Sequence, residues 1–135
     1  MANGSVTLAD WGRLVLRVSI GGCMLFHGLN KLLGPGVSSI VPLLDGKGLP
    51  EFLAYGVYLG EIVAPLLILV GVCTRPAAIV LAFTRAMAIF LAHSGEVLSL
   101  GAHGAWEIET PALFLLGGVA IAMLGGGKLG FGKQG

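Results

Sequence analysis

The sequence predicts an all-α protein, a four-helix transmembrane bundle, and three observations point to it. Of the 135 residues, 56% are hydrophobic and 11% are charged, whereas soluble domains average about 25% charged residues. The apolar residues gather in four runs, and stretches rich in glycine, proline or polar residues separate these runs. Each run also holds one or more ionisable residues, which membrane helices retain where the side chains face one another.

The first crossing is expected at residues 12–33. A polar N-terminal stretch precedes it, in which Thr7 and Asp10 could cap the helix, and Trp11 is typical of a membrane interface. Spacings of four and three residues place several side chains on one face of this helix. They are Arg17, Gly21, Met24, Gly28 and Lys31. The two glycines on that face allow another helix to approach closely.

The second crossing is expected at residues 52–72, after a loop at residues 34–50 that contains several glycines and prolines. The apolar middle of this loop is too short to cross a bilayer and is expected to lie on the membrane surface. Glu61 lies inside the second crossing, and Pro65 follows it by four residues. Since proline has no amide proton, the helix is expected to kink beside this carboxylate.

The third and fourth crossings are expected at residues 76–93 and 106–124, which completes a single domain at residues 1–135. Arg85 lies inside the third crossing, and the fourth begins at Trp106 with Glu109 in its first turns. The glycine-rich C-terminal tail is expected to be flexible. No basic cluster indicates nucleic-acid binding, and the small-residue faces would allow a homo-oligomer without requiring one.

The distribution of basic residues predicts the orientation of the chain in the membrane. One side of the bundle would carry Arg13, Arg75, Lys128 and Lys133, and the other would carry Lys31 and Lys47. Basic residues favour the cytoplasmic side. Both termini are therefore expected in the cytoplasm.

Glu61 and Arg85 are the main candidate functional residues. A rise of about 1.5 Å per residue places both near the middle of the bilayer, where they can form an ion pair. Arg17 is expected to reach toward this layer, while Lys31 is expected to extend to the membrane surface. Two interpretations of the Glu61–Arg85 pair stay open here, a purely structural contact and the lining of a functional pocket.

His27, His93 and Glu109 form a second candidate layer near the outer ends of their helices. The two histidines lie at similar depths, so a haem with two histidine ligands is geometrically conceivable, as is a single metal ion with Glu109. No CxxCH or HxxxH motif accompanies them, and neither haem nor a metal site is expected. Cys23 and Cys73 are expected to be inert apolar residues.

These residues and motifs together resemble the DoxX family of small bacterial four-helix membrane proteins. The resemblance covers residues 14–130 and rests on the order of several loose motifs. They are an arginine early in the first helix, the G-x-x-K ending at Lys31, Glu61, the L-x-G-x-x-T-R-P that includes Arg75, His93 and Glu109. The sequence departs from the family pattern at Arg85, where an apolar residue is expected, and in its glycine-rich tail.

The resemblance implies a multi-pass protein of the bacterial cytoplasmic membrane that is linked to redox metabolism. It also implies a quinone as the candidate cofactor and a redox or membrane protein as the partner. Our first hypothesis is a quinone-interacting subunit in which Glu61, Arg85 and Arg17 act on the quinone. His27, Lys31, His93 and Glu109 would then bind it or relay protons. The alternatives are a non-catalytic anchor or assembly partner and a small transporter or proton conductor.

Overall fold

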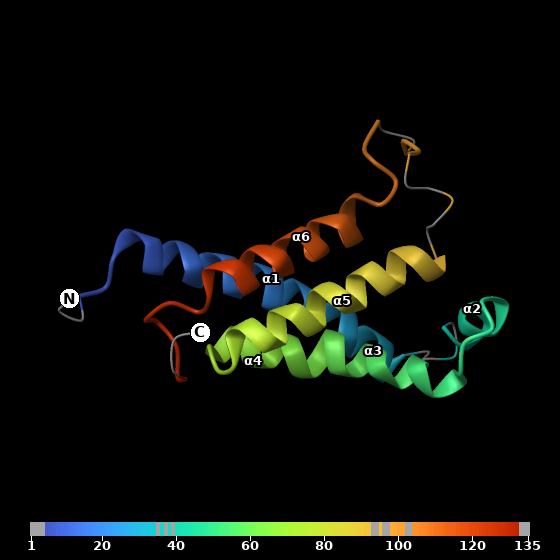
Figure 1. Ribbon diagram of the computed structural model, residues 1–135, viewed down its shortest axis with the longest axis horizontal. Helices are drawn as coiled ribbons and strands as arrows, with labels where there is room; N and C mark the ends of the chain where they lie inside the picture. The colour runs from blue at the N-terminus through green and yellow to red at the C-terminus, as the bar shows by residue number, and fades with distance from the viewer. Residues whose placement is uncertain are drawn as a thin grey trace.

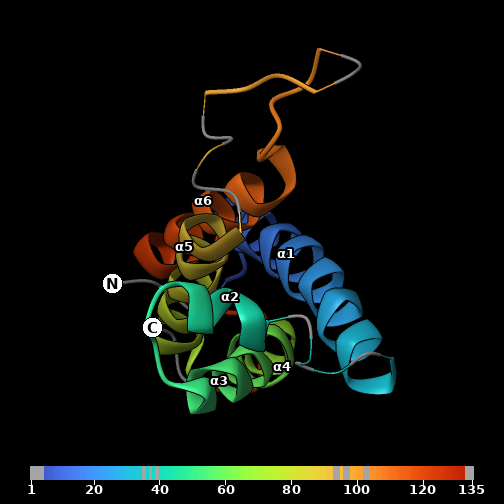
Figure 2. The same cartoon turned by 90° about the vertical axis from the view of Figure 1, so that its right-hand side faces the viewer.

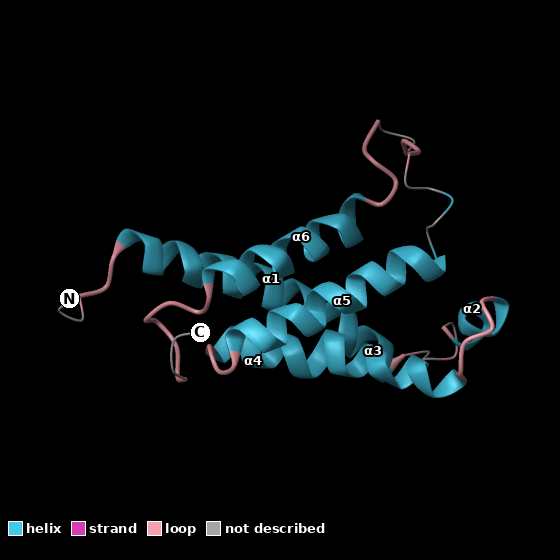
Figure 3. Ribbon diagram, in the orientation of Figure 1, coloured by secondary structure: helices cyan, strands magenta, loops and turns pink. Residues whose placement is uncertain are grey.

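The computed structural model describes residues 5–34, 36, 38, 40–92, 95, 98–101 and 104–132. The helical elements of these described residues group into four long segments, which lie side by side (Figure 1). The first, third and fourth are α1 (Leu8–Leu33), α5 (Thr74–Ala92) and α6 (Glu109–Leu124). Outside the helices, the described residues form one isolated antiparallel bridge between Leu100 and Trp106 and no strand (Figure 3). The all-α class is therefore confirmed.

α1 begins at Leu8, four residues before the predicted start. The hydroxyl of Thr7 accepts a hydrogen bond from the amide of Asp10, and the carboxylate of Asp10 accepts one from the amide of Thr7. This reciprocal arrangement satisfies amides that have no partner inside the helix. The predicted cap at Thr7 is confirmed, and it extends the helix beyond the apolar run.

The second long segment changes its helical geometry along its length. It consists of η1 (Glu51–Tyr55), α3 (Gly56–Tyr58), η2 (Leu59–Val63) and α4 (Ala64–Val70), of which η2 is a π-helical turn that contains Glu61. Pro65 follows at the start of α4, where its missing amide proton disrupts regular hydrogen bonding. The segment ends at Gly71, whose φ of 76° suits glycine.

The four segments pack around one another (Figure 2), and their buried side chains form one hydrophobic core. α5 packs on α6 and on α4, and α1 packs on α4 and α6. Small residues let α5 approach its neighbours, as the buried Ala77 and Ala78 show. The larger buried side chains of the core are Met24, Ile68, Leu81, Phe114 and Ile121.

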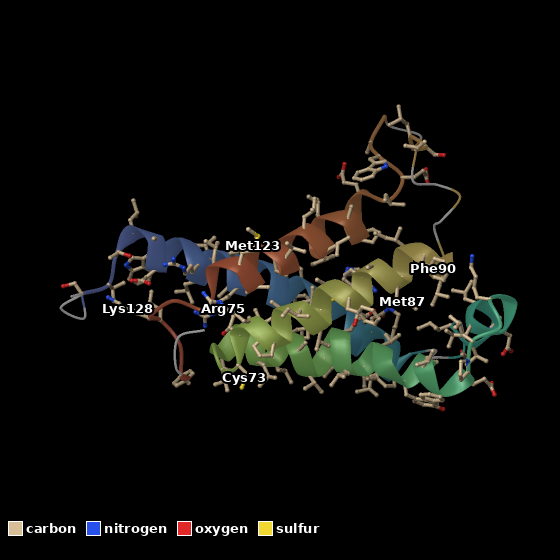
Figure 4. The ribbon with its side chains drawn as sticks, viewed as in Figure 1. Cys73, Arg75, Met87, Phe90, Met123 and Lys128 are labelled. Atoms are coloured by element: carbon tan, nitrogen blue, oxygen red, sulfur yellow. The ribbon has the colours of Figure 1, made fainter. Side chains whose placement is uncertain are left out.

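A short helix, α2 (Val41–Gly46), packs against η1 and α5 at one end of the bundle (Figure 2). Its Leu44 is buried and packs in a small cluster with Ala54 of η1. The ammonium of Lys47 lies 4.7 Å from the ring centre of Phe90, a residue near the α2 end of α5 in Figure 4. The apolar piece predicted to lie on the membrane surface is thus attached to the bundle.

Two helical stretches, Glu51–Val70 and Thr74–Leu91, are long and apolar enough to span a membrane. Only 33% of the residues in each apolar window are buried, so about two thirds of these residues are at least partly exposed. A core helix of a soluble protein would bury most of its apolar residues, and a large exposed apolar surface indicates contact with lipid. Glu109–Leu124 is a shorter apolar helix.

Arg17 connects the C-terminal tail to the bundle. Its buried guanidinium donates hydrogen bonds to the carbonyls of Ile68 and Leu69 at the end of α4 and to those of Gly126 and Leu129 in the tail. The tail also pairs with the turn after α4, where the amide of Phe131 donates to the carbonyl of Val70. The expectation of a flexible tail is therefore wrong for its described residues, because a buried cation binds their carbonyls.

The described residues nearest the two chain ends lie at the same end of the bundle (Figure 1). The ammonium of Lys128 donates to the carbonyl of Ser5, and its amide donates to the carboxylate of Asp10. Figure 4 shows Arg75 and Lys128 at this end. This clustering agrees with the predicted grouping of basic residues on one side.

Replacing Arg17 with methionine is expected to lower the free energy of unfolding by at least about 2 kcal/mol, because four carbonyl oxygens lose a charged donor. The variant should also become sensitive to trypsin after Lys128. Thermal unfolding in detergent and limited proteolysis check both effects. Arg75→Met, which removes an exposed arginine, is the control. Equal melting temperatures of the two variants would contradict this role of Arg17.

The cap at Asp10 is expected to make stability depend on pH. The hydrogen bond from the Thr7 amide holds the pKa of Asp10 below its ordinary value. The carboxylate therefore stabilises the fold above about pH 4 and loses this contribution as the pH falls through its lowered pKa. Between about pH 6 and about pH 3, a range that brackets the ordinary carboxyl pKa, melting temperatures should fall less for Asp10→Asn than for the unmodified protein.

Candidate functional site

A cavity of about 730 Å³ lies between the second helical segment, α5 and α2. Its wall is mostly apolar and includes Ile40, Leu43, Leu53, Val57, Met87 and Leu91. Three ionisable side chains also line it, namely Lys31, Glu61 and Arg85. An apolar hollow with a few polar groups is the usual form of a site for a small organic molecule.

Glu61 binds two cations from two different helices. Its Oε2 lies 2.8 Å from a guanidinium nitrogen of Arg85 on α5, and its Oε1 lies 2.8 Å from the ammonium of Lys31 on α1. The carboxylate is fully buried. The predicted ion pair between Glu61 and Arg85 is confirmed, and the cluster joins three of the four helical segments.

Lys31 lies in the last turn of α1 and does not extend to the membrane surface as predicted. Its side chain is 25% exposed, and its ammonium donates to both oxygens of Glu61. A buried carboxylate without enough partners is costly, and this cost outweighs the tendency of lysine to reach water. The spacing of three residues between Gly28 and Lys31 was the available signal, because it places Lys31 on the face that packs against Glu61.

Two glycines allow neighbouring helices to pack closely around Glu61. A Cβ at Gly28 would overlap the backbone carbonyl of Glu61, and a Cβ at Gly60 would overlap the side chain of Thr84. α1 and α5 therefore approach the π-helical turn from two sides. Such turns insert an extra residue into a helix and are frequent at functional sites. The sequence predicted the close packing at Gly28, whereas the roles of Gly60 and Thr84 were missed.

Arg85 has hydrogen-bonding capacity that the described residues do not use. The residue is 9% exposed, and one of its nitrogens binds Glu61. Its Nε is buried and has no hydrogen-bond partner among the described residues. An unsatisfied buried donor is costly, so the guanidinium of Arg85 is not fully compensated by the described residues.

The other predicted site residues do not join this cluster. Arg17 binds backbone carbonyls at the opposite end of α4. The ring of His27 packs edge-on against Phe114, with 5.4 Å between the ring centres, and Glu109 is exposed at the start of α6. His93 lies outside the described residues. Within the described part of the chain, no group of three or more His, Cys, Asp or Glu side chains is arranged to hold a metal ion.

Comparisons with known proteins found a matching family model and one similar protein. The DoxX family model matches residues 12–94. The chain is 30% identical to the “Putative oxidoreductase CatD” of Bacillus subtilis (strain 168) over 114 residues, which cover 84% of this chain and 79% of that protein. No solved structure matches this chain.

Replacing Gly28 with alanine is expected to destabilise the protein by about 1–3 kcal/mol, because the new methyl group would push α1 away from Glu61. Gly22→Ala is the matched control, since it lies on the same helix and nothing lies within 4 Å of the added Cβ. Thermal unfolding of both variants checks this expectation. It would be refuted if Gly28→Ala were as stable as Gly22→Ala.

Proposed function

Since this chain belongs to the DoxX family, we propose that it is a quinone-binding membrane subunit of an oxidoreductase system. The cavity that contains Lys31, Glu61 and Arg85 would take the quinone. The observation that carries this proposal is a mostly apolar cavity lined by Arg85, a buried cation whose hydrogen-bonding capacity the described residues do not fully use.

The dimensions and wall of the cavity suit a quinone. A volume of about 730 Å³ lies within the range of pockets for small organic ligands, roughly 300–1,000 Å³. The apolar residues of η1, α3 and α5 would surround the ring and the first part of an isoprenoid tail. α2 contributes the buried Leu44 to the cavity wall at one end.

The three ionisable side chains supply the groups that quinone chemistry needs. A quinone takes up two electrons and two protons when it is reduced. Arg85, and Lys31 beside it, would donate hydrogen bonds to a quinone carbonyl, which positions and polarises it. Glu61 is the candidate proton carrier, because a carboxyl group in a closed site can exchange protons with a bound ligand. Arg17 has no part in this proposal, since its donors bind backbone carbonyls.

Family membership also supports a proposal for the membrane topology and for the electron donor. All four long helical segments would cross the cytoplasmic membrane, with both termini in the cytoplasm. The exposed apolar side chains of α1 and α6, such as Phe26, Val119 and Met123, support lipid contact for the two helices that are less apolar or shorter. Electrons would reach the quinone from a redox partner protein.

Purified protein is expected to bind one quinone per chain, and Arg85→Gln should weaken this binding by about tenfold or more through loss of a charged donor. Titration of a short-chain quinone into protein in lipid nanodiscs measures the affinity. Arg75→Gln is the matched control, because it removes an exposed arginine from the same helix. It should bind quinone with the affinity of the unmodified protein.

Absence of quinone binding in the unmodified protein would refute the proposal. Partner co-purification that is unchanged in Glu61→Gln and Arg85→Gln would then favour the membrane anchor. Proton flux in proteoliposomes without any partner, lost in Glu61→Gln, would favour the proton conductor.

A further inference from the structure

The formal charges of the ionisable side chains that line the cavity do not sum to zero. In their ordinary charged forms, Lys31 and Arg85 contribute two positive charges, and Glu61 contributes one negative charge. The described residues that line the cavity include no other ionisable side chain. The site therefore has a formal surplus of one positive charge beside apolar walls, where an uncompensated charge is costly.

Arg17, another buried cation, shows how this fold compensates a buried positive charge. The guanidinium of Arg17 donates to four carbonyl oxygens. By contrast, the described contacts of Arg85 and Lys31 end on the two oxygens of one carboxylate, and the Nε of Arg85 is left without a partner. The residue with the unused donor, Arg85, is one of the two cations that line the cavity.

The cavity also has a wall that faces the surroundings of the bundle. Leu59, Ile79 and Phe83 line the cavity and are themselves 52%, 60% and 66% exposed. These side chains belong to the two helices that are long and apolar enough to span a membrane. An apolar tail could therefore extend from the cavity between these helices into lipid.

We infer that the site selects amphiphiles with a single negative charge, whose anionic head lies against Arg85 and Lys31 and whose apolar tail extends past Phe83. This inference rests on the proposed function in that it assigns a ligand class to the same cavity. Two sources share the required chemistry, namely an ionised hydroxyquinone and the carboxylate of a long-chain fatty acid.

Two matched pairs of probes test the inference and separate the sources. The first pair is a 2-hydroxy-3-alkyl-1,4-naphthoquinone, which is ionised at neutral pH, and the same alkylnaphthoquinone without the hydroxyl group. The second pair is dodecanoate and dodecanol. Calorimetric titration of protein in phosphatidylcholine nanodiscs, with empty discs subtracted, gives each affinity. The anion of at least one pair is expected to bind about tenfold tighter than its neutral counterpart.

Charge variants test whether the preference for the anion over the neutral ligand depends on the charges of this cluster. A purely structural ion cluster would show no such dependence. Lys31→Met keeps the Glu61–Arg85 pair and removes the surplus charge, so the preference for the anion should disappear. Glu61→Gln doubles the surplus charge, so the anion should bind about tenfold tighter than to the unmodified protein. Lys47→Met, which removes a lysine outside the cavity lining, should leave the preference unchanged.

The outcomes distinguish this inference from the proposed function. Equal binding of the neutral and the ionised naphthoquinone, without a preference for dodecanoate over dodecanol, overturns the inference and leaves quinone binding standing. A preference for dodecanoate with no binding of either naphthoquinone supports the inference and refutes quinone binding. An anion preference that survives Lys31→Met overturns the assignment of the head to this cluster.

Discussion

The carboxylate of Glu61, shared by two cations, is the interaction on which the arrangement of this protein depends. It connects α1, the second helical segment and α5 at one buried point. In an environment poor in water, removal of one partner from such a cluster leaves a charge that nothing else can solvate. The surrounding geometry supports this contact, since Gly28 and Gly60 permit backbone approaches that any side chain would prevent.

Part of this cluster could be predicted from the sequence, because charges in apolar runs must find partners and depth along a helix can be counted. The Glu61–Arg85 pair followed from that argument. The position of Lys31 did not follow, because a lysine in the last turn of a helix can reach either the interior or the surface. Packing at Gly28 decides between the two, because it brings α1 against the π-helical turn that contains Glu61. The sequence contains no local signal for that turn beyond Pro65.

The role of Arg17 could not be predicted for a different reason. Its acceptors are backbone carbonyls, which every residue possesses, so no residue type marks them. The glycine-rich tail was predicted to be flexible from its composition, yet its described glycines allow the chain to lie close to Gly71 and Val72. Helix boundaries shifted for similar local reasons, as the extension of α1 to its cap at Thr7 shows.

Buried charged side chains are thus stabilised in two different ways within one bundle. At one end, backbone dipoles solvate the buried cation of Arg17. Near the other end, three ionisable side chains, Lys31, Glu61 and Arg85, line a mostly apolar cavity with a formal surplus of one positive charge. The first arrangement resembles a permanent structural contact, and the second has the unused capacity that ligand binding requires.

The tail contact also bears on the biosynthesis of the chain. Two of the four carbonyls that solvate Arg17 belong to Gly126 and Leu129, which the ribosome adds more than a hundred residues after the arginine itself. During translation the first helix is therefore made with a cation whose final acceptors do not yet exist. Other polar groups or water must solvate that charge in the interval, so the bundle closes at this end only when the tail has been made.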